Sequence, residues 1–127
     1  MRILNGDVDL RNKKLRRLPM KSDGEFLFTD VNVNGQFSIS ENKITSLEGC
    51  PVKVNESFVC SINKELHSLK GAPIYVGKHF MCNSTGITSL DGCPKEVGGD
   101  FVCYNNKREF TIEEVRRVCN VHGSIIV

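Results

Sequence analysis

The sequence lacks tryptophan, has only three histidines, and contains no apolar run long enough to cross a membrane. A membrane-spanning helix needs about 20 consecutive apolar residues, so we expect no such span. The opening residues, MRILNGDVDL, contain neither the apolar segment nor the cleavage site of a secretory signal. These absences predict a cytoplasmic protein, in which the six cysteines would stay reduced.

Motifs of catalysis and of metal binding are missing as well. No Cys-x-x-Cys pair occurs, and no nucleophile signature accompanies the histidines, which are His67, His79 and His122. The adjacent carboxylates Glu113 and Glu114 belong to a helix-capping motif. We therefore predict that the protein is not an enzyme and that it has no catalytic residue, no metal and no cofactor.

What the sequence does contain is a repeat of about 21 residues. A phenylalanine is followed two positions later by Cys or Ile, then by Asn or Thr, Ile or Leu, a second Leu, a Gly-x-Pro turn and a Val. The phenylalanines are Phe37, Phe58, Phe80 and Phe101, and the residues two positions later are Ile39, Cys60, Cys82 and Cys103. The register extends to the N-terminus through Leu4, Val8, Leu10, Leu15 and Leu18. Self-similarity at such a period indicates a solenoid of stacked coils.

Each column of the repeat has a physical reason. In Phe-x-Cys the two side chains point to the same side of a short strand, because side chains alternate along a strand. We expect one strand per coil, paired in parallel with its neighbours, so that Phe packs on Phe and Cys on Cys. The Asn column is expected to bind main-chain groups at a tight bend, and Gly-x-Pro to form the return turn. Cysteine shares its columns with Ile39, Leu10 and Ala72, which predicts buried free thiols.

The predicted fold is a mainly β, short leucine-rich-repeat-like solenoid of about five coils, with a parallel sheet and a C-terminal helical cap. As a single domain, residues 1–127 divide into a first coil (1–18), a coil with an insertion (19–47), three regular coils (48–110) and a helix-and-strand cap (111–127). The insertion, at about 19–30, is expected to be a hairpin covering the first coil or a loop that carries contacts.

The cap is predicted from a capping box at Thr111 and Glu114, followed by an apolar stripe at helical spacing. The stripe consists of Ile112, Val115, Val118 and Cys119, Gly123 is expected to end the helix, and residues 124–127 to form a short strand. The alternative is a partner-binding helix with Arg116 and Arg117 exposed.

The repeat resembles the leucine-rich repeat, in the short form found in secreted bacterial effectors. Phe80-Met81-Cys82 corresponds to its strand, Asn63 and Asn106 to its asparagine, and the Gly-x-Pro prolines to its proline, with one extra residue between Val and Phe. The phrases ITSLEGCP, ITSLDGCPKEVGGDFVC and FTIEEVRRVCNVHGSI also resemble small repeat proteins of tailed bacteriophages. That resemblance implies a protein located in the cytoplasm of an infected host bacterium, and it implies no reaction.

Between Phe and Cys in each coil lies a residue whose side chain is expected to point away from the core, in order Asp9, Ser38, Val59, Met81 and Val102. The last three would form an apolar ladder, with a polar rim of His79 and Asp100 on one side and of Asn83 and Tyr104 on the other. An apolar stripe with a polar rim is typical of a protein interface. Two other interpretations are that β-branched residues simply favour strands, and that the insertion covers the ladder. Our leading hypothesis is a protein-binding module, an inhibitor or modulator of a host bacterial protein.

A basic run occupies the turn of the first coil, although the net charge of the chain is only +2. The residues of this run are Arg11, Lys13, Lys14, Arg16 and Arg17. Clustered cations bind phosphates, which gives the alternative hypothesis of a nucleic-acid-binding regulator. A solvated face that keeps the first coil from pairing with other strand edges is the simpler interpretation. The third hypothesis is self-association, through the ladder or through an end coil.

Overall fold

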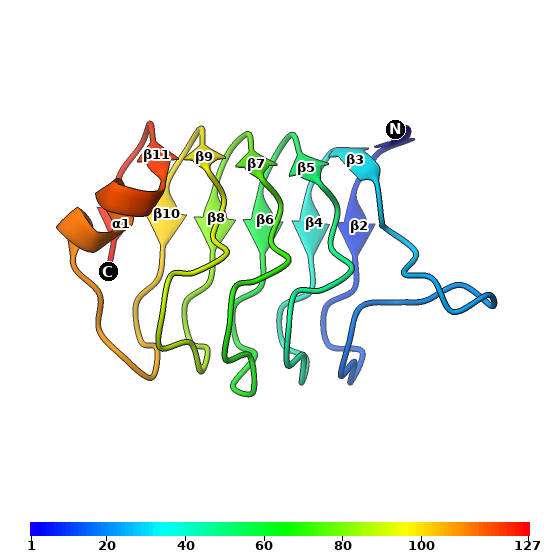
Figure 1. Ribbon diagram of the computed structural model, residues 1–127, viewed down its shortest axis with the longest axis horizontal. Coiled ribbons are helices and arrows are strands. Elements are labelled where there is room, and N and C mark those ends of the chain that lie inside the picture. Colours follow the sequence, from blue (N-terminus) through cyan, green and yellow to red (C-terminus); the bar gives the residue numbers. More distant parts are fainter.

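The repeats fold into coils that lie one above the other, and each coil contributes a strand to two parallel sheets (Figure 1). The computed structural model describes residues 1–127. Sheet A contains β1 (Arg2–Asn5), β3 (Val31–Asn34), β5 (Lys53–Val54), β7 (Tyr75–Val76), β9 (Glu96–Val97) and β11 (Asn120–Val121). Sheet B contains β2 (Val8–Asp9), β4 (Phe37–Ser38), β6 (Phe58–Val59), β8 (Phe80–Met81), β10 (Phe101–Val102) and β12 (Ile125–Ile126). With one short helix, α1 (Ile112–Val118), near the C-terminus, the prediction of a mainly β solenoid with parallel pairing and a helical cap is confirmed.

The prediction of one strand per coil is wrong, because the Val column forms a sheet of its own. Val33 pairs in register with Val54, Val54 with Val76, and so on along the solenoid. A three-residue corner separates each Val from the following Phe, so the chain turns from sheet A into sheet B. At one corner, a Cβ added to Gly77 would lie 2.0 Å from the carbonyl oxygen of Asn55 in the coil before. Glycine there permits the close stacking of successive corners.

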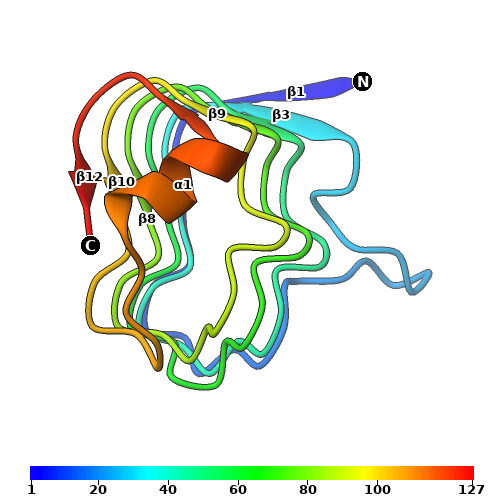
Figure 2. The same ribbon diagram turned by 60° about the vertical axis from the view of Figure 1, so that its left-hand side comes forward.

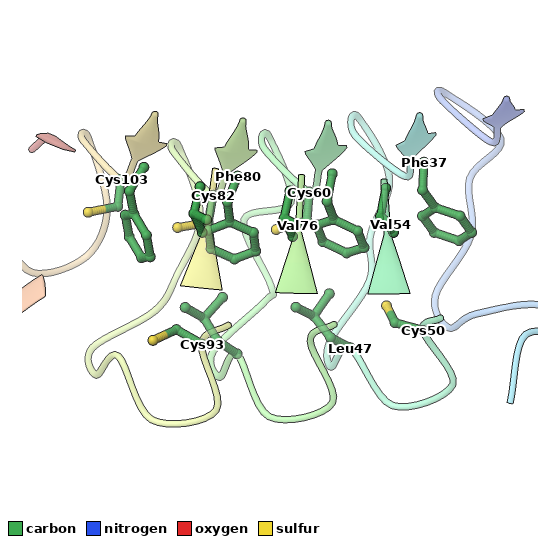
Figure 3. Packing of buried hydrophobic residues seen from close by; sticks show 14 of the residues in the cluster. Phe37, Leu47, Cys50, Val54, Cys60, Val76, Phe80, Cys82, Cys93 and Cys103 are labelled. Atoms are coloured by element: carbon green, nitrogen blue, oxygen red, sulfur yellow. The ribbon is translucent and has the colours of Figure 1, made fainter. Parts of the chain in front are cut away.

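A continuous pile of phenylalanines runs through the core, as the repeat predicts (Figure 3). The ring centroids of Phe37 and Phe58 lie 5.7 Å apart, those of Phe58 and Phe80 5.8 Å, and those of Phe80 and Phe101 5.1 Å. All four side chains are fully buried. One coil alone could not bury such a ring on both faces, so stability depends on the stacking of neighbouring coils.

The six cysteines are buried free thiols, which confirms the interpretation of their columns. Cys60, Cys82 and Cys103 follow one another behind the strands of sheet B (Figure 3). Burial raises the pKa of the Cys93 thiol to about 11 and that of Cys119 to about 12. A thiolate is the reactive form of cysteine, so these side chains act as small apolar core residues.

The asparagine column binds main chain from coil to coil, as expected. The Asn63 amide donates to the carbonyl oxygens of Ile39, Cys60 and Ser61. Its side-chain oxygen accepts from the Ile44 N–H at 3.1 Å. Asn63 is completely buried, and a buried main-chain group without a partner costs about 1–3 kcal/mol. The column therefore stabilises the bend that follows sheet B in each coil.

The insertion at 19–30 projects from the first coils (Figure 2), and Phe28 at its base packs against the end of the phenylalanine pile. A single antiparallel bridge joins Met20 to Phe26, so the insertion is a minimal hairpin. The ring of Phe28 meets Phe37 edge-on at 5.0 Å. This arrangement agrees with the expectation of a hairpin that covers the first coil.

Helix α1 begins with the predicted capping box, in which Thr111 Oγ1 accepts from the Glu114 N–H and the Glu114 carboxylate accepts from the Thr111 N–H. Two details of the prediction are wrong. The helix ends at Val118, and Gly123 instead forms the corner between β11 and β12. Of the apolar stripe, Val115 and Cys119 are buried whereas Ile112 and Val118 are exposed, because the helix lies across the end of the solenoid with one narrow side inward (Figure 2).

Candidate binding surfaces

The outer face of sheet B carries one outward side chain per strand, aligned by the parallel register. These residues are Asp9, Ser38, Val59, Met81, Val102 and Ile126, and we call them the outer ladder. The half toward the N-terminus is polar, and the half toward the C-terminus is apolar. The sequence prediction placed five of these positions correctly and omitted Ile126.

Exposure along the outer ladder differs from the prediction at one position. Val59 and Met81 are half-buried, as expected for the outward side of a sheet. Val102 is only 7% exposed, because it has a large apolar neighbour on each side, Met81 and Ile126. Ile126 itself is 43% exposed. The accessible apolar surface therefore has two parts, one formed by Val59 and Met81 and the other by Ile126. The prediction of Val102 as an accessible contact residue is wrong.

The insertion does not cover the outer ladder, so that interpretation is wrong. Its main-chain oxygens at Leu27 and Thr29 accept hydrogen bonds from the Arg2 guanidinium in β1 of sheet A. Phe28 packs on Phe37 inside the solenoid, and Phe26 lies over the turn at Gly49. These contacts keep the insertion on the side of sheet A and at the N-terminal end.

The rim at the corner between the sheets consists of side chains that hold the next coil. Ser57 Oγ accepts from the His79 N–H at 3.2 Å, His79 Nδ1 from the Asp100 N–H at 3.0 Å, and Asp100 Oδ1 from the Ser124 N–H at 2.8 Å. An Nδ1 that accepts carries no proton, which places the imidazole proton on Nε2. His79 and Asp100 thus border the ladder, but their inner polar atoms already bind main chain.

On the opposite rim the two predicted contact residues differ in accessibility. Tyr104 is 44% exposed and remains available to a partner. Asn83 is only 7% exposed, and its Oδ1 is buried without a hydrogen-bond partner. The accessible position predicted for Asn83 is therefore wrong, because its side chain is buried in the stack of coils.

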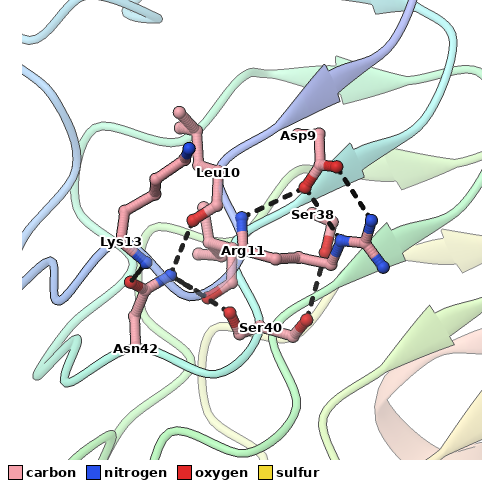
Figure 4. Close-up of polar contacts among 8 residues, drawn as sticks. Asp9, Leu10, Arg11, Lys13, Ser38, Ser40 and Asn42 are labelled. Carbon is pink, nitrogen blue, oxygen red and sulfur yellow. Dashed lines mark hydrogen bonds and ion pairs between the residues drawn. The ribbon is translucent and has the colours of Figure 1, made fainter.

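The polar half of the outer ladder surrounds an open hollow of about 340 Å³. Ser38 and Ser40 lie within it, their hydroxyls 3.2 Å apart, and Val59 borders it on the apolar side. Arg11 donates from both Nε and Nη2 to the Asp9 carboxylate, at 2.8 and 2.9 Å (Figure 4). These hydrogen bonds lower the pKa of Asp9 to about 2. Asp9 therefore remains ionised at neutral pH and neutralises Arg11.

The other cations of the basic run are free of such pairs. Lys13, Lys14, Arg16 and Arg17 are exposed, and none of them forms an ion pair. The main chain beneath them is fixed, because the Asn42 side-chain oxygen accepts from the N–H groups of Lys13 and Leu15 (Figure 4). Four of the five predicted nucleic-acid-binding residues are thus unpaired cations on a bend fixed by hydrogen bonds. The fifth, Arg11, is paired with Asp9.

Side chains that could ligate a metal do not gather in groups of three or more. No helix in the chain is both long and apolar enough to pass through a bilayer. Comparison with protein families, with curated proteins and with solved structures gives no match to this chain.

Proposed function

We propose that the protein is a non-enzymatic protein-binding module whose contact surface is the apolar half of the outer ladder. The observation that carries this proposal is a set of accessible apolar side chains, Val59, Met81 and Ile126, on one face of a stacked sheet. The apolar but buried Val102 lies between Met81 and Ile126. Exposed Tyr104 lies at its rim. Aromatic residues and Met are enriched in protein interfaces, and a contiguous apolar patch marks such surfaces.

The geometry of the face favours a steric mode of action. Each inner strand of sheet B is paired with a neighbour on both sides, and the corner side chains of Ser57, His79 and Asp100 bind the following coil. A face held in this way loses little conformational freedom when it binds, which lowers the entropic cost of association. The protein would act by covering a surface of its partner.

The partner in this proposal is a protein of a host bacterium, and the module acts as its inhibitor or modulator in the host cytoplasm. This part depends on the resemblance of the repeat phrases to small bacteriophage repeat proteins. It also requires that the apolar face be covered by a different protein rather than by a second copy of the chain.

The test replaces Met81 with Asp and uses Tyr75→Asp as the matched control. Tyr75 is half-buried in β7 of the same coil, but it lies on the outer side of sheet A. Wild type and control are expected to capture the same bacterial protein from lysate, whereas Met81→Asp loses it by at least about tenfold, since a charge is desolvated in the contact. Circular dichroism and thermal unfolding establish that both variants fold.

Two results would contradict the proposal. Retention of the captured protein by folded Met81→Asp would exclude the outer ladder as the contact surface. Sedimentation that shows a wild-type dimer and a monomeric Met81→Asp would assign the face to self-association instead.

A further inference from the structure

The bend that follows sheet B contains a second ordered column, which consists of lysines. Each bend has a residue in the left-handed region two positions after the Cys column, and these residues are Asn12, Glu41, Ile62, Ser84 and Asn105. The first bend has a second left-handed residue, which is Lys14 itself. Two positions further along, the equivalent residues are Lys14, Lys43, Lys64, Gly86 and Lys107. Lysine therefore occupies this position in the first three coils without interruption. We call Lys14, Lys43 and Lys64 the lysine row.

Main-chain hydrogen bonds hold these bends one above the other. The Asn12 N–H donates to the Ser40 oxygen, and the Glu41 N–H donates to the Ser61 oxygen, both at 3.2 Å. The Ile62 N–H continues the series by donating to Asn83. Beyond these residues the first bend differs, since Lys14 is itself left-handed and the Lys43 N–H donates to the Leu15 oxygen. Lys43 therefore lies opposite Leu15 and Arg16, and the three lysines leave three successive bends without an even spacing.

None of these lysines is neutralised within the chain. All three are exposed, and the ion pairs of the protein involve other cations. Lys13, Arg16 and Arg17 extend the row at the first coil, whereas Glu41 and Glu65 are the acidic residues that border it in the sequence. Two unit charges about 5 Å apart in water repel by about 0.8 kcal/mol. Six cations on three adjacent bends repel one another, so a ligand that brings closely spaced negative charges would relieve this repulsion.

We propose that the lysine row, together with Lys13, Arg16 and Arg17, binds the phosphodiester backbone of a nucleic acid. Cations gathered on three successive bends suit closely spaced phosphates, since a nucleic-acid strand carries one charge per about 3.4 Å. No aromatic residue occupies the bends of these first three coils, so the row binds phosphates and does not stack on bases. Contacts of this kind fix position and carry no sequence information. The surface is separate from the outer ladder, and the proposal is independent of the protein partner.

The test compares two triple variants that change the net charge equally. Lys14→Glu/Lys43→Glu/Lys64→Glu removes the row, and Lys53→Glu/Lys70→Glu/Lys95→Glu changes three exposed lysines elsewhere. Fluorescence anisotropy measures the binding of a labelled DNA duplex and of a labelled single strand. For about four phosphate contacts, wild-type affinity falls about 100-fold between about 50 and 200 mM salt. The row variant is expected to lose at least about tenfold in affinity at low salt, with a salt slope smaller by about 2.7, and the control triple to lose far less.

A preference for the duplex or for the single strand identifies which form of nucleic acid supplies the phosphates. Either preference supports the proposal that the lysine row binds them. Equal affinity of the two triple variants would overturn the proposal, as would binding to phosphatidylserine vesicles without binding to nucleic acid. If the glutamate triple fails to fold, Lys14→Gln/Lys43→Gln/Lys64→Gln replaces it, with the same expected decrease in salt slope. Met81→Asp should bind nucleic acid as wild type does, which separates this site from the outer ladder.

Discussion

The two ends of the solenoid are closed by different means. At the C-terminal end α1 lies across the last coil, buries Val115 and leads into β11 and β12, which add a final layer to both sheets. At the N-terminal end the only ring that covers the phenylalanine pile is Phe28. The first end is closed by a capped helix and a final layer of both sheets, and the second by Phe28 together with the half-buried Leu4, Val8, Leu10 and Leu15 of the first coil.

Because the two ends are closed differently, a single substitution should affect their stability to different extents. A capped helix is held by several local hydrogen bonds and by a buried side chain. A single substitution there removes only part of the stabilisation. At the N-terminal end Phe28 is the one aromatic ring among smaller apolar residues, so its substitution removes the largest side chain of this layer. We therefore expect the largest effect of any end mutation at Phe28.

Replacing Phe28 with Ala is predicted to destabilise the protein by about 3–5 kcal/mol, the usual cost of removing a buried aromatic ring. The reason is that Phe37 would lose its edge-on partner and a cavity would remain beside its ring. Urea unfolding followed by circular dichroism measures the change. Phe26→Ala is the comparison, because Phe26 is half-buried outside the pile. A loss at Phe28 no greater than at Phe26 would show that the insertion does not close this end.

The sequence predicts the core better than the surface, for a reason visible in the residues. Phe58, Phe80 and Phe101 recur because each must fit between equivalent rings, so the spacing alone indicates the pile. The second sheet is harder to find, because β5, β7, β9 and β11 each contain a single buried residue and so show no alternation. The four-residue strand Val31–Asn34 is the clearest signal of it.

Surface exposure depends on residues that are distant in the sequence. The burial of Val102 follows from Ile126, which lies 24 positions away in the next layer. Ile126 was nevertheless within reach of the repeat, because Val121, Ile125 and Val127 reproduce the V-x-x-x-F-x-C spacing with different apolar residues. The three lysines of the lysine row can also be found in the printed sequence, because each lies four positions after the Cys column of its repeat.

At the C-terminal end, Thr111→Ala is predicted to cost about 1 kcal/mol, the typical value of a helix N-cap. The Glu114 N–H would lose its acceptor, and the reciprocal bond would lose its fixed geometry. Urea unfolding gives the total effect, and hydrogen exchange shows whether the opening is local to α1. Thr111→Ser retains the hydroxyl and serves as the control, with little expected loss. A decrease equal to that of Phe28→Ala would mean that both ends are closed by single contacts.

Alkaline pH distinguishes the ends without a large mutation, because the first 49 residues contain no cysteine and the last coils contain Cys93 and Cys119. An unperturbed thiol in the unfolded chain has a pKa near 9.0, whereas burial raises that of Cys93 to about 11 and that of Cys119 to about 12. The folded state therefore retains protons that the unfolded state releases. This contribution to stability is complete below pH 9 and is lost as the pH rises from about 9 to about 12.

We accordingly predict that hydrogen exchange above about pH 9, corrected for its intrinsic rate, accelerates in α1, β11 and the coil around Cys93 before it does in the cysteine-free first coil. Cys93→Ala is the matched variant, since Ala72 occupies the same column in the preceding repeat. Its unfolding free energy should decrease less steeply with pH than that of wild type, because one buried thiol fewer can release its proton on unfolding. The prediction fails if the unfolding free energies of the two proteins have the same slope against pH, or if the cysteine-free first coil opens earlier. Either result would mean that groups other than the thiols cause the loss of stability at alkaline pH.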